Sequence, residues 1–149
     1  MARFEGRVAI VTGGSRGIGA ATATKFAEDG AKVAIFDINE SAMKETANAL
    51  RNKGYDVSTY TVNVADVEQV ESAVKTVADQ YGKIDILVNN AGVIRDNLLF
   101  KMTDDDWQTV MDVHLKGAFN CSRAVQKYMV ENKYGRIVNI SSTSALGNR

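Results

Sequence analysis

Short runs of β-branched and apolar residues alternate along this chain with longer segments of helical period, and this alternation limits the fold more than any other feature. Strands joined by helices in this way build βαβ units around a parallel sheet. The predicted strands are Val8–Val11, Lys32–Asp37, Val57–Val62, Ile84–Asn89 and Arg136–Ile140. The predicted helices are Ile18–Asp29, Ser41–Lys53, Val67–Tyr81, Thr103–Leu115 and Gly117–Asn132. We therefore expect an α/β fold.

Local signals mark the ends of these helices. Asp66 with Gln69, and Thr103 with Asp106, place an N-cap acceptor three residues before a polar partner, which is a capping-box arrangement. The chain contains no proline, so glycine supplies the stops, because it adopts positive φ without steric cost. The expected stops are Gly30, Gly54, Gly82 and Gly135.

Composition indicates one water-soluble domain over residues 1–149 that acts on small molecules. The 18 basic residues balance 18 acidic ones, so the chain lacks the positive field that drives binding to nucleic acid or an anionic membrane. One histidine and one cysteine do not supply a metal ligand set, and Cys121 is expected to be a small buried apolar residue. The start of the sequence resembles no signal peptide, so we expect a cytoplasmic protein.

A glycine-rich turn follows the first predicted strand and leads into the first helix. Gly13, Gly17 and Gly19 stand at G-x-x-x-G-x-G spacing. Glycine lets the backbone approach a pyrophosphate closely, and the helix N-terminus offers unpaired N–H groups and a positive dipole end. Ala20 stands where a P-loop would have its lysine, which excludes a kinase or GTPase loop. The alternative is a plain strand-to-helix turn.

Two charged residues bear on which nucleotide would bind. Asp37 ends the second strand 18 residues after Gly19, where a carboxylate can accept hydrogen bonds from the adenosine ribose hydroxyls. It favours NAD, because a carboxylate repels the 2′-phosphate of NADP. Arg16 could instead pair with that phosphate, so NADP stays possible. The alternative for Asp37 is an Asp turn before the next helix.

These residues resemble the short-chain dehydrogenase/reductase family, most closely its 3-oxoacyl-acyl-carrier-protein reductase branch. The resemblance runs from about Phe4 to the last residue, and its most specific parts are Thr12–Gly19 (T-G-G-S-R-G-I-G) and Asn89–Gly92 (N-N-A-G). It implies a Rossmann-type doubly wound parallel sheet with strand order 3-2-1-4-5. It also implies that Asn89 holds the central strands, and Trp107 is expected to serve packing rather than substrate contact.

The family implies a cofactor site position by position. Gly13, Gly14, Ser15, Arg16, Gly17, Ile18 and Gly19 would hold the pyrophosphate, and Asp37 and Ile38 would meet the adenosine ribose. Asn63 and Val64 would flank the adenine, although the family often has Asp in place of Asn63. Asn90, Ala91 and Gly92 would line the nicotinamide side, or form a structural turn.

Ser142 matches the catalytic serine of the family, whose hydroxyl would orient the substrate oxygen for hydride transfer, with Ser141 as the neighbouring alternative. His114 stands where the family usually has Asn. It could relay protons through water, or it could be a satisfied helix histidine without a catalytic role.

The family's catalytic Tyr-x-x-x-Lys motif is not in this sequence, since residues four places after the five tyrosines are Thr59, Val64, Asp85, Asn132 and Val138. In relatives the motif lies on the helix after the Ser142 strand, so we expect a chain truncated before it, without the later strands and helices. One edge of the sheet would then be exposed, and the chain would be weakly stable or dependent on other copies or a second segment.

The leading functional hypothesis is an NAD(P)-dependent oxidoreductase that transfers hydride between a nicotinamide cofactor and a carbonyl or secondary alcohol, with reduction of a 3-oxoacyl thioester as the expected reaction. The alternatives are a dehydrogenase of sugars, polyols or cyclic alcohols, and a nucleotide-binding fragment without turnover. The resemblance implies that the parent protein is a homotetramer or homodimer.

Overall fold

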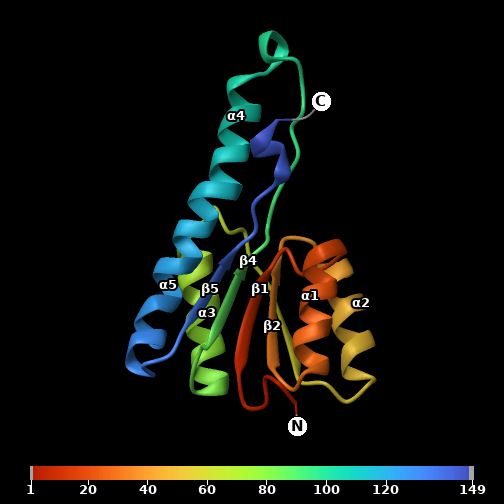
Figure 1. The fold of residues 1–149 in the computed structure, drawn as a ribbon, viewed down its shortest axis with the longest axis vertical. Coiled ribbons are helices and arrows are strands. Elements are labelled where there is room, and N and C mark those ends of the chain that lie inside the picture. Colours follow the sequence, from red (N-terminus) through yellow and green to blue (C-terminus); the bar gives the residue numbers. More distant parts are fainter. Residues whose placement is uncertain (1, 148–149) are drawn as a thin grey trace.

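The computed structural model describes residues 2–147 and forms a five-stranded, all-parallel sheet in the order β3-β2-β1-β4-β5 (Figure 1). This order confirms the expected 3-2-1-4-5 arrangement. The strands are β1 (Val8–Thr12), β2 (Lys32–Asp37), β3 (Val57–Thr61), β4 (Ile86–Asn89) and β5 (Arg136–Asn139). The expectation of a truncated chain concerns the end of the sequence, where Asn148 and Arg149 lie outside the described residues.

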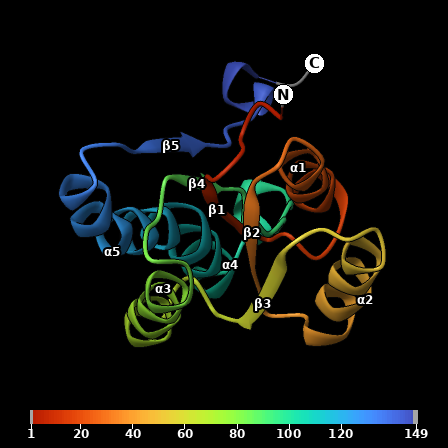
Figure 2. The same ribbon diagram turned by 90° about the horizontal axis from the view of Figure 1, so that it is seen from below.

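The sheet is covered by helices on both faces, which explains its continuous apolar strands. All five residues of β1 are buried, and its two faces belong to two separate apolar clusters. Figure 2 shows α1 (Gly17–Glu28) and α2 (Glu40–Arg51) on one face, with α3 (Val67–Tyr81) and α5 (Gly117–Glu131) on the other. Because all strands are parallel, their carboxyl ends share one edge of the sheet.

Helix termini largely follow the sequence signals. Thr103 and Asp106 form the full capping box at the start of α4 (Asp104–Val110). Asp66 caps α3 by accepting from the N–H groups of Glu68 and Gln69, while the Gln69 amide donates to the Asp66 carboxylate rather than to its backbone. The positive φ of Gly30, Gly54 and Gly82 confirms three of the predicted stops.

The prediction for Gly135 is wrong. The positive φ after α5 falls on Lys133, at 51°, because the chain already turns two residues earlier. Gly135 serves packing instead, since a Cβ atom there would lie 2.5 Å from the sulfur of Met129.

The two helices expected over 103–132 form one continuous helical rod. A π-helical turn, η2 (Met111–Lys116), joins α4 to α5, where a break was expected before Gly117. Gly117 has helical φ and lies against Val64, where a Cβ atom would come within 2.6 Å. π-turns inside α-helices are rare and are found frequently at functional sites.

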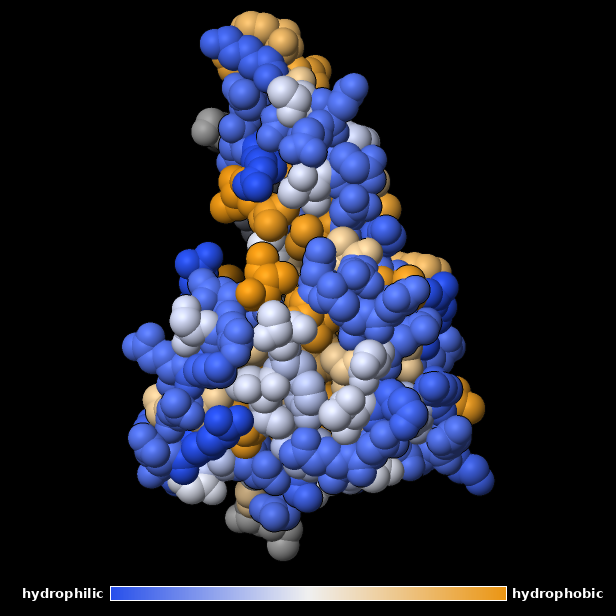
Figure 3. All heavy atoms as spheres, turned by 180° about the vertical axis from the view of Figure 1, so that it is seen from behind, coloured by the Kyte–Doolittle hydropathy of each residue, from blue (hydrophilic) through white to orange (hydrophobic). Residues whose placement is uncertain are grey.

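The α4 and η2 part of this rod projects past the carboxyl ends of the strands (Figure 1). Together with the segment that follows β4, it forms an arm. The arm carries exposed apolar side chains, among them Leu99, Phe100 and Trp107. Trp107 is 60% exposed, so the described residues leave most of its side chain uncovered. Figure 3 shows apolar surface at the tip of the arm and at the waist between arm and sheet.

The β5 edge is exposed, as expected. Every residue of β5 is solvent-accessible, and Ile137 and Val138, on opposite faces of the sheet, are 42% and 46% exposed.

At the opposite end of the strands, a buried carboxylate ties β1 to the start of β4. Asp85 accepts from the Val8 N–H at 2.9 Å and pairs with Arg7 at 2.7 Å and Lys83 at 3.1 Å. Burial acts to raise the pKa of Asp85, but these donors outweigh it and hold the pKa below its usual value. The cluster lies far from the carboxyl edge and stabilises the sheet.

Candidate cofactor site

In the glycine loop between β1 and α1, backbone atoms approach so closely that Gly13 and Gly19 have no room for a side chain. Gly13 adopts φ of 63°, and its N–H donates to the Phe36 carbonyl of β2 at 2.8 Å. A Cβ atom on Gly19 would lie 2.1 Å from the Gly13 carbonyl oxygen. The first turn of α1 therefore sits directly against the end of β1, which is the close approach that a phosphate cradle requires.

The N-terminus of α1 is open toward this loop. Arg16 occupies the N-cap position with extended backbone, and its side chain makes no capping hydrogen bond within the described chain. The first-turn N–H groups and the positive end of the helix dipole are therefore available to an anion.

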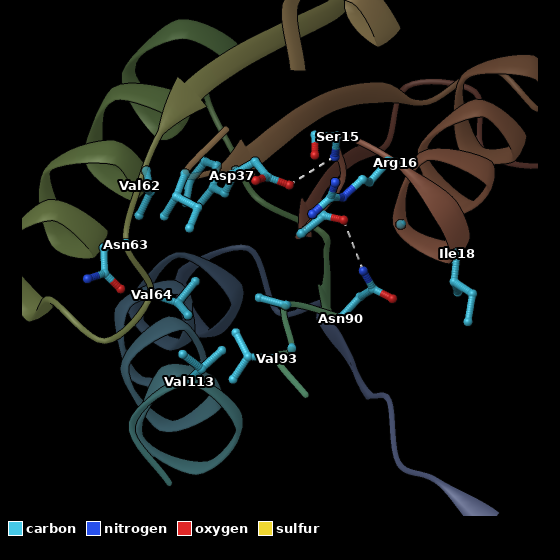
Figure 4. Close-up of a pocket in the computed structure, with 16 residues that line it drawn as sticks. Ser15, Arg16, Ile18, Asp37, Val62, Asn63, Val64, Asn90, Val93 and Val113 are labelled. Carbon is cyan, nitrogen blue, oxygen red and sulfur yellow. Dashed lines mark hydrogen bonds between the residues drawn. The ribbon is translucent and has the colours of Figure 1, made fainter. Parts of the chain in front are cut away.

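Asp37 ends β2 beside the loop, and its carboxylate is held by two backbone donors. Oδ2 accepts from the Ser15 N–H at 3.0 Å (Figure 4), and Oδ1 accepts from the Asn39 N–H at 3.0 Å. Thr46 of α2 fixes the same loop by donating to the Ser15 carbonyl at 2.7 Å. The contact to Asn39 is the Asp turn that was the alternative to a ribose-binding role for Asp37. The carboxylate forms this turn and also lines the cavity, where its oxygens keep unused acceptor positions.

Asn90 ties the end of β4 to the glycine loop. Its amide nitrogen donates to the carbonyls of Thr12 and Gly13 at 3.0 and 3.1 Å (Figure 4). The buried Thr12 hydroxyl in turn accepts from the N–H groups of Asn90 and Ala91, both at 3.0 Å. The two sequence motifs, far apart in the chain, are therefore one hydrogen-bonded unit.

These elements enclose a cavity of about 350 Å³ at the carboxyl edge of the sheet, within the size range of small-molecule sites. It is lined by Gly13, Ser15, Arg16, Ile18, Gly19, Asp37, Ile38, Asn63, Val64, Asn90, Ala91 and Gly92, all predicted as cofactor residues, and by Phe36, Val62, Val93 and Val113. The last four were missed because the sequence gives them only the signal of core residues.

Two predicted residues, Gly14 and Gly17, do not line the cavity. A Cβ atom on Gly14 would lie 2.8 Å from the Ile35 side chain, so Gly14 faces the core. Gly17 has φ of 56° with open space around it, so its role is the backbone turn into α1.

The candidate catalytic residues lie outside this cavity. Ser142 follows β5 and is the N-cap of the short 3-10 turn η3 (Thr143–Leu146), where its hydroxyl oxygen accepts from the Ser144 N–H at 3.1 Å. That bond leaves the Ser142 hydroxyl able to donate to another group. Neither Ser142 nor Ser141 lines the cavity in the described residues.

His114 reaches the cavity wall through the backbone of Val93. Its Nε2 lies 3.1 Å from the Val93 nitrogen and 2.8 Å from the Val93 oxygen. One ring nitrogen serves only one of these contacts at a time, as an acceptor or as a donor according to its tautomer. The ring also covers Gly92, where a Cβ atom would lie 2.7 Å from Cε1. These contacts place the His114 ring against the cavity wall at Gly92 and Val93.

Two further sequence expectations are met. Asn89 links β4 to β5 and α5 by donating to Asn139 at 2.8 Å and to Ser122 at 3.1 Å, as expected for a residue that holds the central strands. Cys121 is buried, and its desolvation raises the pKa of the thiol to about 12, so it is an unreactive core residue.

Neither a metal centre nor a membrane span emerges from residues 2–147. No three His, Cys, Asp or Glu side chains in this range gather closely enough to hold a metal ion. None of its helices combines the length and apolar character needed to cross a bilayer.

A doubly wound parallel sheet with a glycine-rich β1–α1 loop and a carboxylate at the end of β2 defines a dinucleotide-binding α/β protein. The chain belongs to the short-chain dehydrogenase family, whose model matches residues 7–148.

Similar proteins agree with this assignment. The chain is 42% identical over 140 residues to the 3-oxoacyl-acyl-carrier-protein reductase FabG of Thermotoga maritima, covering 94% of this chain and 57% of that protein. It is 43% identical to the BbsD subunit of the hydroxy(phenyl)methylsuccinyl-CoA dehydrogenase of Thauera aromatica, covering 97% of this chain and 58% of that one. The crystal structure of gox2181 superposes with a TM-score of 0.95 at 43% identity, covering 99% and 58% of the two chains. The chain therefore spans less than two thirds of the length of these relatives.

Proposed function

We propose that this chain binds a nicotinamide dinucleotide in the 350 Å³ cavity and that its parent protein is an NAD(P)-dependent oxidoreductase. The observation that carries the proposal is the hydrogen-bonded unit of glycine loop, Asp37 and Asn90, which leaves an uncapped helix N-terminus facing the cavity. Membership of the short-chain dehydrogenase family supports it.

NAD is the preferred cofactor in this proposal. The Asp37 carboxylate lines the cavity and is held in place by two backbone donors, so it cannot easily turn away from a 2′-phosphate. Arg16 also lines the cavity but is exposed and forms no side-chain hydrogen bond within the described chain, so it is the less constrained of the two charges. A fixed carboxylate accepts from free ribose hydroxyls and repels a phosphate.

In this proposal different residues of the chain bind the cofactor, orient the substrate and position the cavity wall. The glycine loop and the α1 N-terminus hold the pyrophosphate, Asn63 and Val64 flank the adenine, and Ala91 to Val93 form the wall on the nicotinamide side. The bound cofactor supplies the hydride. The Ser142 hydroxyl orients the substrate carbonyl, and His114 fixes the wall through Val93.

A 3-oxoacyl thioester is the proposed substrate of the parent protein. Two relatives of comparable identity are named for thioester chemistry, one on an acyl-carrier-protein substrate and one on a CoA ester. Sugars, polyols and cyclic alcohols are the alternative substrates. A homotetramer or homodimer is the proposed assembly, supported by the exposed apolar side chains of the arm.

A second candidate function is nucleotide binding without turnover by these 149 residues. The observation that favours it is chemical: none of the five tyrosines lines the 350 Å³ cavity, and none has a lysine four residues later. The tyrosine that the family uses to protonate the product alkoxide therefore does not line this cavity.

Fluorescence titration of NADH, with NADPH in parallel, tests the binding proposal. We expect saturable NADH binding and weaker NADPH binding. Asp37→Asn should reduce the preference for NADH at least tenfold, about 1.4 kcal/mol, because the amide keeps one acceptor and loses the charge. Asp66→Asn is the matched control, since it removes a carboxylate from another strand-to-helix junction and keeps an N-cap acceptor. No NADH binding by a folded chain would refute the proposal.

NADH oxidation with acetoacetyl-CoA then separates the two candidate functions. Turnover of the thioester, and not of polyols in the reverse direction, supports the reductase. Binding without turnover of any substrate supports the second candidate.

A further inference from the structure

The side chain of Asn89 is left with one unmade hydrogen bond in the interior. Asn89 is 8% exposed, and its amide nitrogen donates one hydrogen to Ser122 of α5 and the other to Asn139 of β5. Its Oδ1 is buried and has no partner among the described residues. Buried side-chain acceptors are satisfied in the large majority of cases, by protein or by ordered water, so this oxygen calls for a donor.

A small cavity lies beside this amide. Its volume is about 50 Å³, and it lies between the carboxyl ends of β1, β4 and β5 and the π-turn η2. It is lined by Thr12, Val64, Asn89, Ala91, Val113, His114, Gly117, Ala118, Asn139 and Ile140. One water needs roughly 10–15 Å³ of such space and two to four polar partners. The cavity is therefore large enough for more than one water.

We propose that this cavity is a binding site for ordered water, in which one molecule donates to Asn89 Oδ1. Two other lining residues have a hydrogen-bonding atom that the contacts among residues 2–147 leave unused. Asn139 accepts from Asn89 through Oδ1, which leaves its amide nitrogen, and His114 uses Nε2 on Val93, which leaves Nδ1. Together with Asn89 Oδ1, these atoms supply the number of partners that a buried water requires.

The chemistry of the lining selects a neutral, water-sized ligand. The lining contains amides, a hydroxyl, an imidazole and apolar groups, and neither a carboxylate nor a lysine or arginine. Nothing in it would compensate the desolvation of an ion. The water would complete the link between β4, β5 and α5 next to Asn90, so it would help to hold the end of β4 on which the glycine loop depends.

An isosteric pair of substitutions at Ala118 tests the proposal. Ala118→Thr and Ala118→Val both fill the cavity from α5 with side chains of the same shape and similar helix propensity, but only threonine brings a hydroxyl. If water satisfies Asn89, both variants displace it, and valine leaves the acceptor unpaired. We expect the unfolding constant of the valine variant to exceed that of the threonine variant about fivefold or more, measured by urea denaturation of the full chain.

Val125→Thr provides the control on the same helix. Val125 is fully buried in the apolar cluster, where a hydroxyl finds no polar partner, so the threonine variant should be less stable than the unsubstituted protein. If Ala118→Thr were no more stable than Ala118→Val, Asn89 Oδ1 would not face this cavity, and that result would overturn the proposal.

A crystal structure of the unsubstituted protein at better than about 2 Å resolution shows directly whether water occupies the cavity. This test does not depend on whether the variants fold. Density within hydrogen-bond distance of Asn89 Oδ1 in this cavity is the expected result. A cavity without density, or a protein donor on Asn89 Oδ1, would refute the site.

Discussion

Gly19→Ala is the substitution that most directly probes the phosphate cradle. The added methyl group would lie 2.1 Å from the Gly13 carbonyl oxygen and 2.5 Å from Asn90 Nδ2, where ordinary contact begins at 3.4 Å. Neither neighbour can yield freely, since Asn90 Nδ2 is bonded to the carbonyls of Thr12 and Gly13. The loop must therefore move by about 1 Å or more relative to α1.

A displacement of this size should weaken NADH binding by about 100-fold, because misplacement by about 1 Å of groups that hold a ligand has effects of that order. This corresponds to about 2.7 kcal/mol. Overpacking should also lower the free energy of unfolding by about 1–3 kcal/mol. Fluorescence titration with NADH and urea denaturation measure the two effects on the same preparation.

Gly82→Ala is the control, because it should lower stability without moving the glycine loop. Gly82 ends α3 with φ of 80° and open space around it, so alanine there costs about 1–2 kcal/mol of backbone strain and produces no clash. We expect unchanged NADH affinity in this variant. If Gly19→Ala bound NADH within threefold of the unsubstituted protein, the cradle would not depend on the close approach of α1 to β1, and the reasoning would fail.

Three further predictions concern other parts of the chain. Asp85→Ala should lower the free energy of unfolding at pH 7 by about 1–3 kcal/mol, because it leaves the buried Val8 N–H without an acceptor. Since the folded-state pKa of Asp85 is depressed, its stabilisation is present above the unfolded pKa near 3.9 and is lost as pH falls through the folded value, so urea titrations from pH 7 to 3 should show the variant and the unsubstituted protein converging. His114→Ala should weaken NADH binding roughly tenfold by releasing Val93, whereas His114→Asn should restore it, because one amide offers both the acceptor and the donor that Val93 needs; equal affinities in titrations of the two variants would contradict this role. Cys121 should resist iodoacetamide at pH 8 in the folded chain and react in urea, as followed by intact mass, and rapid labelling of the folded chain would show that α5 opens.

Much of the lining of the 350 Å³ cavity could be predicted from the sequence because its determinants are local. Gly13 and Gly19 act through the absence of a Cβ atom, and Asp37 acts through its place at the end of a strand that β-branched residues define. The carboxyl ends of parallel strands meet at one edge, so short motifs at four strand ends were enough to place the cavity.

The residues that the sequence could not identify depend on contacts between distant segments. Phe36, Val62, Val93 and Val113 carry the pattern of core residues, and only the packing of the strand ends against the helical arm turns them toward the cavity. The exposure of Trp107 likewise depends on the tertiary structure, because α4 projects beyond the sheet.

The sequence by itself determined the order of elements, the parallel sheet and the phosphate loop, because hydrophobic period, capping residues and glycine positions act over a few residues. Tertiary structure alone decided the π-turn that replaces the expected break before Gly117, the contact of His114 with Val93, and the unpaired oxygen of Asn89 beside its cavity. Hydrogen bonds and steric fit between segments 20 to 50 residues apart leave no local pattern in the sequence, and they exist only when the folded chain brings those segments together.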